Sequence, residues 1–471
     1  MTLMRPTRLL SSMLLAGLVL GACGGGGDDG GGGGGDDAAA PASACPLEAL
    51  EAATAPVDIT FWHGMTANNE VTLKALTDEY NAAQDKVKVT LAFQGTYDEM
   101  SDKYITALRG GELPNVVMLE ETRIQPMIDT KSALPAQACV DADDYDLSDH
   151  LEAVVQEFTI GDTMWPMPFN VSGPVLYYDT NDFTKAGLDP DDPPSTFEEL
   201  EAAAKAIKDS GAAKSGMALT LSPGNIEQWF NMAGEPIVDN NNGRDGRAAT
   251  ATLDTDVGRE ALDFMGRMLS SGLAVNVGRN ANEADNVLAL GAGDAGMTIG
   301  TSAALGTVWA VKDGGQYADV GVGVAPMPGP VAAADGGILT SGASLWMVDK
   351  DKSDAEKAAT WDYVKFLNEP SSQATWHLGT GYIPIRKTAV DDPKVQELWQ
   401  RRPSFRVAYD QLLSSKGGNG PVIGAYKEFR EALVEGLERV MVRGEKPAAA
   451  LQAAEQKASE AMQSYNDRVG G

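Results

Sequence analysis

The sequence predicts an α/β protein with two domains. Segments with the apolar pattern of strands alternate along the chain with segments whose apolar residues recur at helical spacing. Such an alternation is typical of a parallel sheet with helices on its faces. About 420 of the 471 residues follow a glycine-rich segment near the N-terminus, which is more than one hydrophobic core usually holds. No internal repeat is visible in the sequence.

The first half of the chain opens with a strand, a helix and a second strand. In VKVTLAF (87–93) apolar and polar residues alternate, and the helix before it carries its apolar residues on one face. The predicted elements are a strand within 57–65, a helix with Leu73, Leu76 and Tyr80, a strand at 87–93, a helix with Tyr104, Ile105 and Leu108, and a strand within 113–121.

The same pattern starts again after residue 178. Ser195 or Thr196 is expected to cap a helix, and Ser353 with Glu356 forms a capping box that opens another. The C-terminal third is predicted to be mostly helical. The predicted elements are strands at 294–300, 318–326 and 343–348, and helices at 195–206, at 257–269, from 353 with Trp361, Val364 and Leu367 on its core face, and from about 447.

The stretch PFNVSGPVLYY (168–178) joins a polar half to an apolar half. Its right half, Val175 to Tyr178, has the composition of a strand. An amide, a hydroxyl, a glycine and a proline directly precede that strand, and buried polar groups need hydrogen-bond partners. This stretch is therefore either an ordinary turn that enters a sheet or a segment that crosses a cleft where a ligand supplies the partner.

Residues 1–23 have the pattern of a bacterial lipoprotein signal peptide. Arg5 and Arg8 precede a short apolar stretch that ends in LGAC at Cys23. This ending resembles the site where such a peptide is cleaved and the cysteine is lipidated. The glycine-rich residues that follow are typical of a flexible tether, which we place at 24–52. These features predict a globular body in the cell envelope, outside the cytoplasm and anchored to the membrane by a lipid.

The predicted compartment bears on the remaining cysteines and on the partners. With Cys23 lipidated, Cys45 and Cys139 are one pair in an oxidising setting, and we predict a disulfide between them. No C-x-x-C pair occurs, and two cysteines cannot form a zinc site unaided. We therefore predict no metal site. The formal net charge of −30 argues against nucleic acid as a partner, and an anionic ligand would need a locally positive pocket.

Signatures of common enzymes and cofactor sites are missing or fail on their context. The sequence has neither G-x-S-x-G nor H-E-x-x-H. GAGDAG (291–296) matches a dinucleotide motif but precedes a strand, and DADDYD (141–146) lacks the glycine and glutamate of a calcium loop. Glu120 and Glu121 are adjacent and would point to opposite faces of a strand, which excludes a paired-carboxylate site. We therefore predict no cofactor and no enzyme, with a secreted hydrolase as the disfavoured alternative.

An ordered set of motifs carries a family resemblance. The motifs are TFWHGM (60–65), QGTYDEM (94–100), PFNVSGPVLYYDTNDFTKAGLDPDDPPSTFEEL (168–200), NNNGRDG (240–246), VGR (277–279), GASLWM (342–347) and GTGYIPI (379–385). Together they resemble the family-1 extracellular solute-binding proteins of ABC importers, over about Thr60 to Arg443. AGLDP with PPSTFEEL alone indicates only the broad superfamily, which includes sugar binders. TFWHGM, QGTY and TGYIPI favour the glycerol-3-phosphate-binding branch.

The resemblance implies a fold, partners and a set of ligand-binding residues. It implies two lobes with hinge strands and a ligand cleft between them, and we place lobe 1 at 53–170 plus 298–342 and lobe 2 at 171–297 plus 343–471. The body is expected to be a monomer that delivers a small ligand to the importer's membrane subunits. The ligand-binding residues implied are Tyr97, Glu121, Ser172, Thr301 (a serine in the family), Gly342, Tyr382 and Arg430.

The implied roles point to a glycerophosphate as ligand. The planar fork of Arg430 suits two phosphate oxygens, Ser172 would donate to another, and Glu121 would accept from glycerol hydroxyls. Leu221 stands where the family carries a tryptophan, so the pocket is expected to be larger and to favour glycerophosphodiesters such as glycerophosphocholine over glycerol 3-phosphate. An oligosaccharide-binding protein, which would need aromatic platforms in place of the arginine, is the alternative.

Overall fold

The computed structural model describes residues 41–279, 285–330, 337–415 and 420–470. The chain divides into two compact units, Met1–Ala38 and Ala39–Gly471, and all described residues lie in the second. The predicted signal peptide, Cys23 and residues 24–40 of the tether lie outside the described residues. Within the described ranges, no helix combines the length and the apolar character that crossing a membrane requires.

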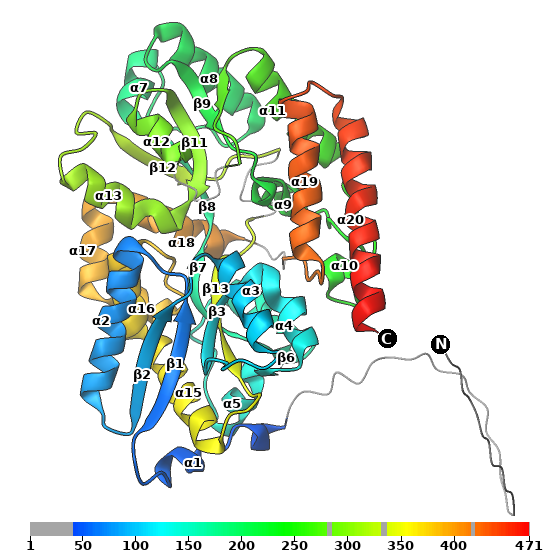
Figure 1. The fold of residues 1–471 in the computed structure, drawn as a ribbon. Helices are drawn as coiled ribbons and strands as arrows, with labels where there is room; N and C mark the ends of the chain where they lie inside the picture. The colour runs from blue at the N-terminus through cyan, green and yellow to red at the C-terminus, as the bar shows by residue number, and fades with distance from the viewer. Residues whose placement is uncertain (1–40, 280–284, 331–336, 416–419, 471) are drawn as a thin grey trace, which may run out of the picture. The chain divides into compact units, whose positions relative to one another are not determined.

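The first lobe is built on a six-stranded mixed sheet (Figure 1). β1 pairs in parallel with β2 and β3, as the alternating pattern predicted, whereas β13 pairs antiparallel with β3, β4 and β7. The strand order is β2-β1-β3-β13-β4, with β7 also paired to β13. The strands are β1 (Val57–His63), β2 (Val87–Phe93), β3 (Val116–Glu120), β4 (Ala133–Leu134), β7 (Met167–Ser172) and β13 (Ser341–Val348).

The second lobe is built on a five-stranded sheet of order β10-β9-β11-β8-β12. β9 pairs in parallel with β10 and β11, and β8 pairs antiparallel with β11 and β12. A short pair, β5 (Thr159–Ile160) and β6 (Thr163–Met164), lies outside both sheets. The strands of the second sheet are β8 (Pro174–Asp179), β9 (Ser215–Leu219), β10 (Ala274–Asn276), β11 (Ala295–Thr301) and β12 (Val322–Pro326).

Helices pack against both sheets. For example, α2 packs on β2, α15 on β1 and α8 on β9. The helices are α1 (Glu48–Glu51), α2 (Ala67–Ala83), α3 (Tyr97–Ala107), α4 (Ile124–Thr130), α5 (Ala136–Ala142), α6 (Glu152–Glu157), α7 (Thr180–Ala186), α8 (Phe197–Ser210), α9 (Pro223–Met232), α10 (Asp239–Gly243), α11 (Asp256–Ser270), α12 (Asp285–Gly291), α13 (Leu305–Asp313), α15 (Asp354–Leu367), α16 (Pro370–Thr380), α17 (Pro393–Arg401), α18 (Ser404–Ser414), α19 (Tyr426–Met441) and α20 (Pro447–Val469). Short 3₁₀ turns are η1 (Ala42–Ala44), η2 (Glu121–Arg123), η3 (Ser302–Ala304) and η4 (Lys387–Asp391).

Local sequence signals located several helix starts correctly. Thr196 and Ser353 each accept a hydrogen bond from the backbone N–H three residues on, and Glu199 and Glu356 complete the two capping boxes. A third capping box, at Thr96, opens α3. Such caps satisfy backbone donors that a helix start otherwise leaves free. Helix starts were therefore readable from a few neighbouring residues.

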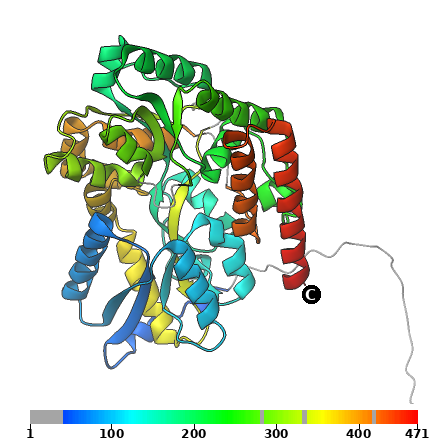
Figure 2. The ribbon, with the colours of Figure 1, turned by 45° about the horizontal axis from the view of Figure 1, so that its top comes forward.

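The predicted division of the chain between the lobes was wrong in its second half. We assigned 298–342 to lobe 1 and 343–471 to lobe 2, but β11 and β12 belong to the second sheet and β13 belongs to the first. α15 packs on β1 and β13, and thus also belongs with the first lobe, whereas α19 and α20 pack on α11 of the second (Figures 1 and 2). The error has a physical reason, because strand pairing across long sequence separations leaves no local signal.

The predicted tether, 24–52, ended too late. Residues 41–52 fold onto the first lobe, where α1 packs against α15 and both Cys45 and Leu50 are buried. The predicted disulfide is present, because Cys45 and Cys139 are bonded with their Cα atoms 5.1 Å apart. The cross-link and the burial of Leu50 hold this segment on α5 and α15, so residues 41–52 belong to the folded first lobe.

The stretch PFNVSGPVLYY crosses between the lobes. β7 ends at Ser172 in the first sheet and β8 begins at Pro174 in the second, so Gly173 is the single residue between the two sheets. Gly173 exchanges hydrogen bonds with Ser302, donating to its hydroxyl at 3.2 Å and accepting from its backbone N–H at 2.9 Å. A Cβ at Gly173 would lie 2.6 Å from the Cδ1 atom of Ile338, so any larger residue would need the end of that side chain to move. The structure shows that this stretch crosses between the lobes, and a ligand as partner of its polar groups stays a prediction.

Candidate ligand-binding cleft

A cavity of about 1020 Å³ lies between the two sheets and draws its lining from both lobes. The first lobe contributes the ends of β2, β3 and β7, the start of α3 and the start of β13. The second lobe contributes the segment after β9, parts of α9 and α12, and one face of α19, and α13, which packs on α2 and α16, adds further lining residues. Since these segments are far apart in the sequence, the site exists only when both lobes are folded.

Seven of the eight residues named from the resemblance line this cavity. They come from separate elements and converge from sequence positions more than 300 residues apart. The seven are Tyr97, Glu121, Ser172, Thr301, Gly342, Tyr382 and Arg430. The structure thus brings them together, and their contact with a ligand stays a prediction.

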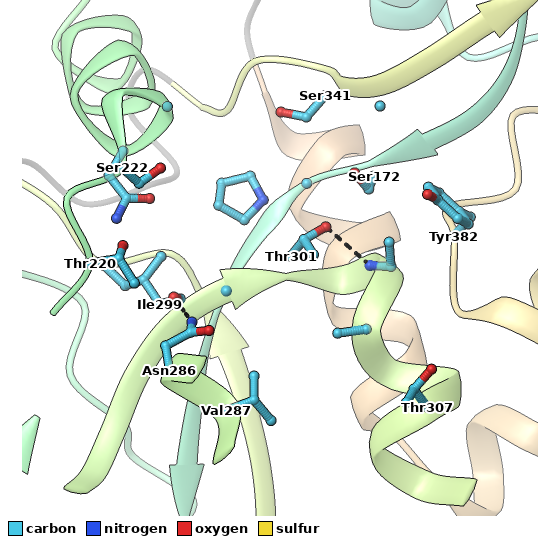
Figure 3. A pocket seen from close by; sticks show the side chains of 18 of the residues that line it. Ser172, Thr220, Ser222, Asn286, Val287, Ile299, Thr301, Thr307, Ser341 and Tyr382 are labelled. Carbon is cyan, nitrogen blue, oxygen red and sulfur yellow. Dashed lines mark hydrogen bonds between the residues drawn. The ribbon is translucent and has the colours of Figure 1, made fainter. Parts of the chain in front are cut away.

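The hinge contributes hydroxyl groups to the cavity. Ser172 pairs with Ser341 across β7 and β13, and Thr301 pairs with Pro174 across β11 and β8. Figure 3 shows Ser172 and Tyr382 on one side of Thr301 and Asn286 on the other. The Thr301 hydroxyl accepts from the N–H of Ala303 at 3.2 Å, so it caps η3 and keeps its own proton for another acceptor.

Two tyrosines form a wall on the first-lobe side. The Tyr97 hydroxyl accepts from the Asn170 side chain at 3.0 Å, and the Tyr382 ring stacks on Trp376 at 5.5 Å. Behind Tyr382, the Nε2 atom of His377 accepts from Trp399 at 2.8 Å, so its Nδ1 atom donates to the Tyr382 carbonyl at 2.7 Å. Burial lowers the pKa of His377 to about 4, which keeps the ring neutral and this arrangement intact at neutral pH.

The backbone conformation at position 342 requires a glycine. Its φ of +117° lies in the region that side chains rarely adopt, and a Cβ there would lie 2.1 Å from the Asn170 carbonyl oxygen. The N–H of Gly342 donates to Glu121 at 3.1 Å. The glycine therefore allows β13 to present a backbone donor to the carboxyl group at the floor of the cavity.

The prediction that Glu120 and Glu121 point to opposite faces was wrong. β3 ends at Glu120, Glu121 begins the 3₁₀ turn η2, and both residues line the cavity. The alternation of a strand does not continue into a turn. Burial, and after it the charge of Glu120, raise the pKa of Glu121 to about 8 against the opposing effect of Arg430. Glu121 is therefore mostly protonated at neutral pH and can donate as well as accept a hydrogen bond.

Arg430 lies on α19 and already has carboxylate partners. Its Nε atom donates to one oxygen of Glu227 at 2.9 Å and a terminal nitrogen donates to the other at 2.6 Å. A Glu121 oxygen lies 3.7 Å from the same nitrogen. The Arg430 side chain is 28% exposed, whereas the Glu227 side chain is only 4% exposed. The guanidinium therefore enters the cavity as one half of an ion pair.

The predicted role of Leu221 is wrong. Leu221 is buried in the core of the second lobe and is not among the residues that line the cavity. Its N–H donates to the Gly278 carbonyl, which holds the segment after β9 so that Thr220 and Ser222 face the cavity instead. The nearby Trp229 on α9 is also buried, and its indole N–H donates to the Pro328 carbonyl at 3.0 Å. The second-lobe wall is therefore polar at this point.

Sequence reasoning missed several lining residues. Glu227 is the most consequential, because it is buried and bound to Arg430. A signal was available, since a single carboxylate lies within the mostly apolar helical stretch IEQWFNM (226–232). A charge in an apolar helix is rarely buried without a partner. Other lining residues that no motif indicated include Phe93, Asn225, Gln228, Asn286, Leu288 and Tyr317.

Comparisons with known sequences give the chain's relatives. A family model for bacterial extracellular solute-binding proteins matches residues 75–403. The sn-glycerol-3-phosphate-binding periplasmic protein UgpB of Yersinia pestis is 30% identical over 412 residues, covering 85% of this chain and 91% of the relative. The protein of the same name from Rhizobium meliloti (strain 1021) is 28% identical over 400 residues, covering 83% and 90%.

Solved structures share the two-lobe fold. UgpB from Mycobacterium tuberculosis in complex with glycerophosphocholine has a TM-score of 0.73 at 22% identity, covering 88% of this chain and 99% of that one. The sugar-binding protein MalE from Xanthomonas citri has a TM-score of 0.73 at 20% identity, with the same two coverages. Both likenesses show the fold alone. Because the family model matches well over half of the sequence, this chain belongs to the bacterial extracellular solute-binding proteins.

Proposed function

We propose that this protein is the solute-binding component of an ABC importer and captures a glycerophosphate, with glycerophosphodiesters such as glycerophosphocholine preferred over glycerol 3-phosphate. The names of its relatives support the ligand class. The observation that carries the proposal is the Arg430 guanidinium in the cleft, together with hydroxyl groups at Ser172, Tyr97 and Tyr382. A planar donor fork with hydroxyl donors nearby suits phosphate oxygens.

The diester preference rests on charge and space. The lining includes the carboxyl groups of Glu99, Glu120, Glu121, Glu157 and Glu227, against the cationic side chains of Arg279, Lys312 and Arg430. Even with Glu121 protonated, this surface repels a dianion more than a diester, which carries one negative charge fewer. The cavity of about 1020 Å³ is at the upper end of the range usual for small-molecule sites, so a headgroup beyond the phosphate has room.

The test is calorimetry with glycerol 3-phosphate, glycerophosphocholine and maltose. We expect glycerophosphocholine to bind most tightly, and we expect no hydrolysis of it, because the protein is proposed to bind without catalysis. Arg430→Ala should lose on the order of 2–5 kcal/mol of binding free energy, as truncation of one partner of a desolvated charge pair does. A loss below roughly 0.5 kcal/mol would remove Arg430 from the site.

The matched control is Arg439→Ala. Arg439 lies on the same helix, pairs with Glu445 at 2.8 Å and does not line the cavity, so binding should be unchanged. Arg430→Ala leaves Glu227 buried without its partner, so its thermal unfolding must be measured beside binding. A variant that still unfolds cooperatively but no longer binds supports a role for Arg430 in the site.

An oligosaccharide ligand is the second candidate. Phe93 lines the cavity and is 51% exposed, and an exposed aromatic face is what a sugar ring packs against. In that case Arg430, which is already paired with Glu227, would not contact the ligand and would only hold Glu227 in position. Binding of maltose without binding of either glycerophosphate would replace the proposal by this alternative.

The proposal also includes a lipid anchor at Cys23 that holds the body at the outer side of the cell membrane as a monomer. LGAC at 20–23 supports it. Cys23→Ala should move the protein from the membrane fraction to the soluble fraction. Retention of the variant on membranes would contradict lipidation.

A further inference from the structure

The ion pair between Glu227 and Arg430 occupies the donors that a phosphate would use. Glu227 accepts from Nε and from one terminal nitrogen, which is the side-on arrangement of a bidentate carboxylate. Among the described residues, the remaining terminal nitrogen of Arg430 has no hydrogen-bond partner. A ligand oxygen must therefore either displace Glu227 or bind the edge of the guanidinium that Glu227 leaves open.

Displacement of Glu227 is expensive. Its side chain is 4% exposed, and α9 and α19 pack against each other around it. A buried carboxylate that loses its hydrogen bonds carries a large desolvation penalty unless it finds new partners. The ligand is thus expected to bind the free edge of Arg430 while Glu227 remains in place.

The pair sets the charge that the ligand meets. The negative charge of Glu227 balances the positive charge of Arg430. The guanidinium therefore donates hydrogen bonds to a ligand, but the pair has no net positive charge. A monoester dianion then meets a guanidinium whose charge Glu227 already neutralises, and no second cation lies within the pair to balance its extra negative charge. A zwitterionic diester meets the same hydrogen-bond donor at a smaller electrostatic cost, and its cationic headgroup is attracted by the acidic lining.

We propose that Glu227 determines ligand specificity by acting as a built-in counterion of Arg430, which admits glycerophosphodiesters of zero net charge and disfavours phosphate monoesters. The proposal rests on the proposed function, because it concerns how the same cleft chooses among glycerophosphates. A role for Glu227 in joining α9 to α19 alone makes a different prediction, since it would affect stability and both ligands alike.

The experiment compares the affinities for glycerol 3-phosphate and glycerophosphocholine in the unmodified protein and in Glu227→Gln. Glutamine keeps the shape and one acceptor oxygen but removes the charge. The ratio of the two dissociation constants should shift by about tenfold or more in favour of glycerol 3-phosphate, because the monoester gains most from the loss of one negative charge. Glu435→Gln is the matched control. It changes the total charge equally, lies on α19 and pairs with Lys457 away from the lining, so the ratio should not move.

The outcomes separate the two proposals. If the unmodified protein binds neither ligand, the proposed function fails and this inference with it. If it binds them but the ratio in Glu227→Gln changes less than about twofold, or both affinities fall together, only the specificity role is overturned. If Glu227→Gln does not fold, the unmodified protein still decides, because equal or tighter binding of glycerol 3-phosphate contradicts a built-in counterion, and weaker binding supports it.

Discussion

The buried ion pair between Arg244 and Glu157 joins the two lobes, and its removal should destabilise the protein strongly. Arg244 follows α10 of the second lobe, and Glu157 ends α6, which packs on β7 of the first. The two side chains are 8% and 2% exposed and lie 3.2 Å apart. Arg244 also donates to the backbone carbonyls of Gln156, Glu157, Thr159 and Gly420. We expect Arg244→Met to cost about 3–5 kcal/mol of unfolding free energy.

The magnitude follows from the geometry. At 3.2 Å and an effective dielectric constant of about 20, the attraction between the two charges is roughly 5 kcal/mol. Methionine fills part of the volume of the arginine but supplies no donor. Glu157 would keep the N–H of Gly420 at 2.7 Å as a partner, which reduces the loss without removing it. Four backbone carbonyls would also lose a charged donor.

The assay is urea denaturation of the unmodified protein, of Arg244→Met, of Glu157→Gln and of the double variant. The double variant should recover much of the loss, because it leaves no buried charge behind. Arg406→Met is the control. Arg406 and its partner Asp410 are 58% and 50% exposed, so the loss in this variant should stay below about 1 kcal/mol.

The pH dependence gives a second readout. Burial raises the pKa of Glu157, and Arg244 opposes that shift, so its pKa should rise further in Arg244→Met. An acid with a raised pKa in the folded state binds a proton that the unfolded chain releases, so stability falls as pH rises from the unfolded pKa towards the folded one. The loss in Arg244→Met should therefore be larger at pH 8 than at pH 5. A loss below about 1 kcal/mol at pH 8, or a double variant no more stable than Arg244→Met, would refute this account.

Three further predictions concern the cleft. Burial and the charge of Glu120 raise the pKa of Glu121 to about 8. Affinity for an anionic ligand should therefore fall as pH rises through 8, because Glu121 then adds a second negative charge beside Arg430. In Glu121→Gln, calorimetry should show no such fall. Gly342→Ala should abolish binding and lower the free energy of unfolding by more than about 1 kcal/mol. The positive φ of Gly342 and the nearby Asn170 carbonyl leave no room for a Cβ. Unchanged thermal unfolding of the variant would contradict this prediction. Leu221→Trp should overpack the core of the second lobe and lower the free energy of unfolding by about 1–3 kcal/mol, without changing the ligand preference. A stable variant with altered ligand selectivity would show that residue 221 does contact the ligand.

The sequence by itself was enough to predict many of the helices and strands and most of the residues named for the cleft. Capping residues at Thr196 and Ser353 and the periodicity of 57–93 located helices and strands, because these signals depend on neighbouring residues. Cys45 and Cys139 could be paired because they are the two cysteines that remain after Cys23. Through the resemblance of its motifs, the sequence also named Arg430, although not its partner.

Only the tertiary structure decided how these parts combine. β13 joins the first sheet although it follows strands of the second, because its pairing with β3 and β7 is a contact between segments far apart in the chain. Leu221 lies in the core while Thr220 and Ser222 face the cleft, a one-residue difference that the hydrogen bond to Gly278 sets. Glu227 meets Arg430 across 203 positions. The charge that a ligand meets is thus a property of two helices packed together, and neither helix carries it alone.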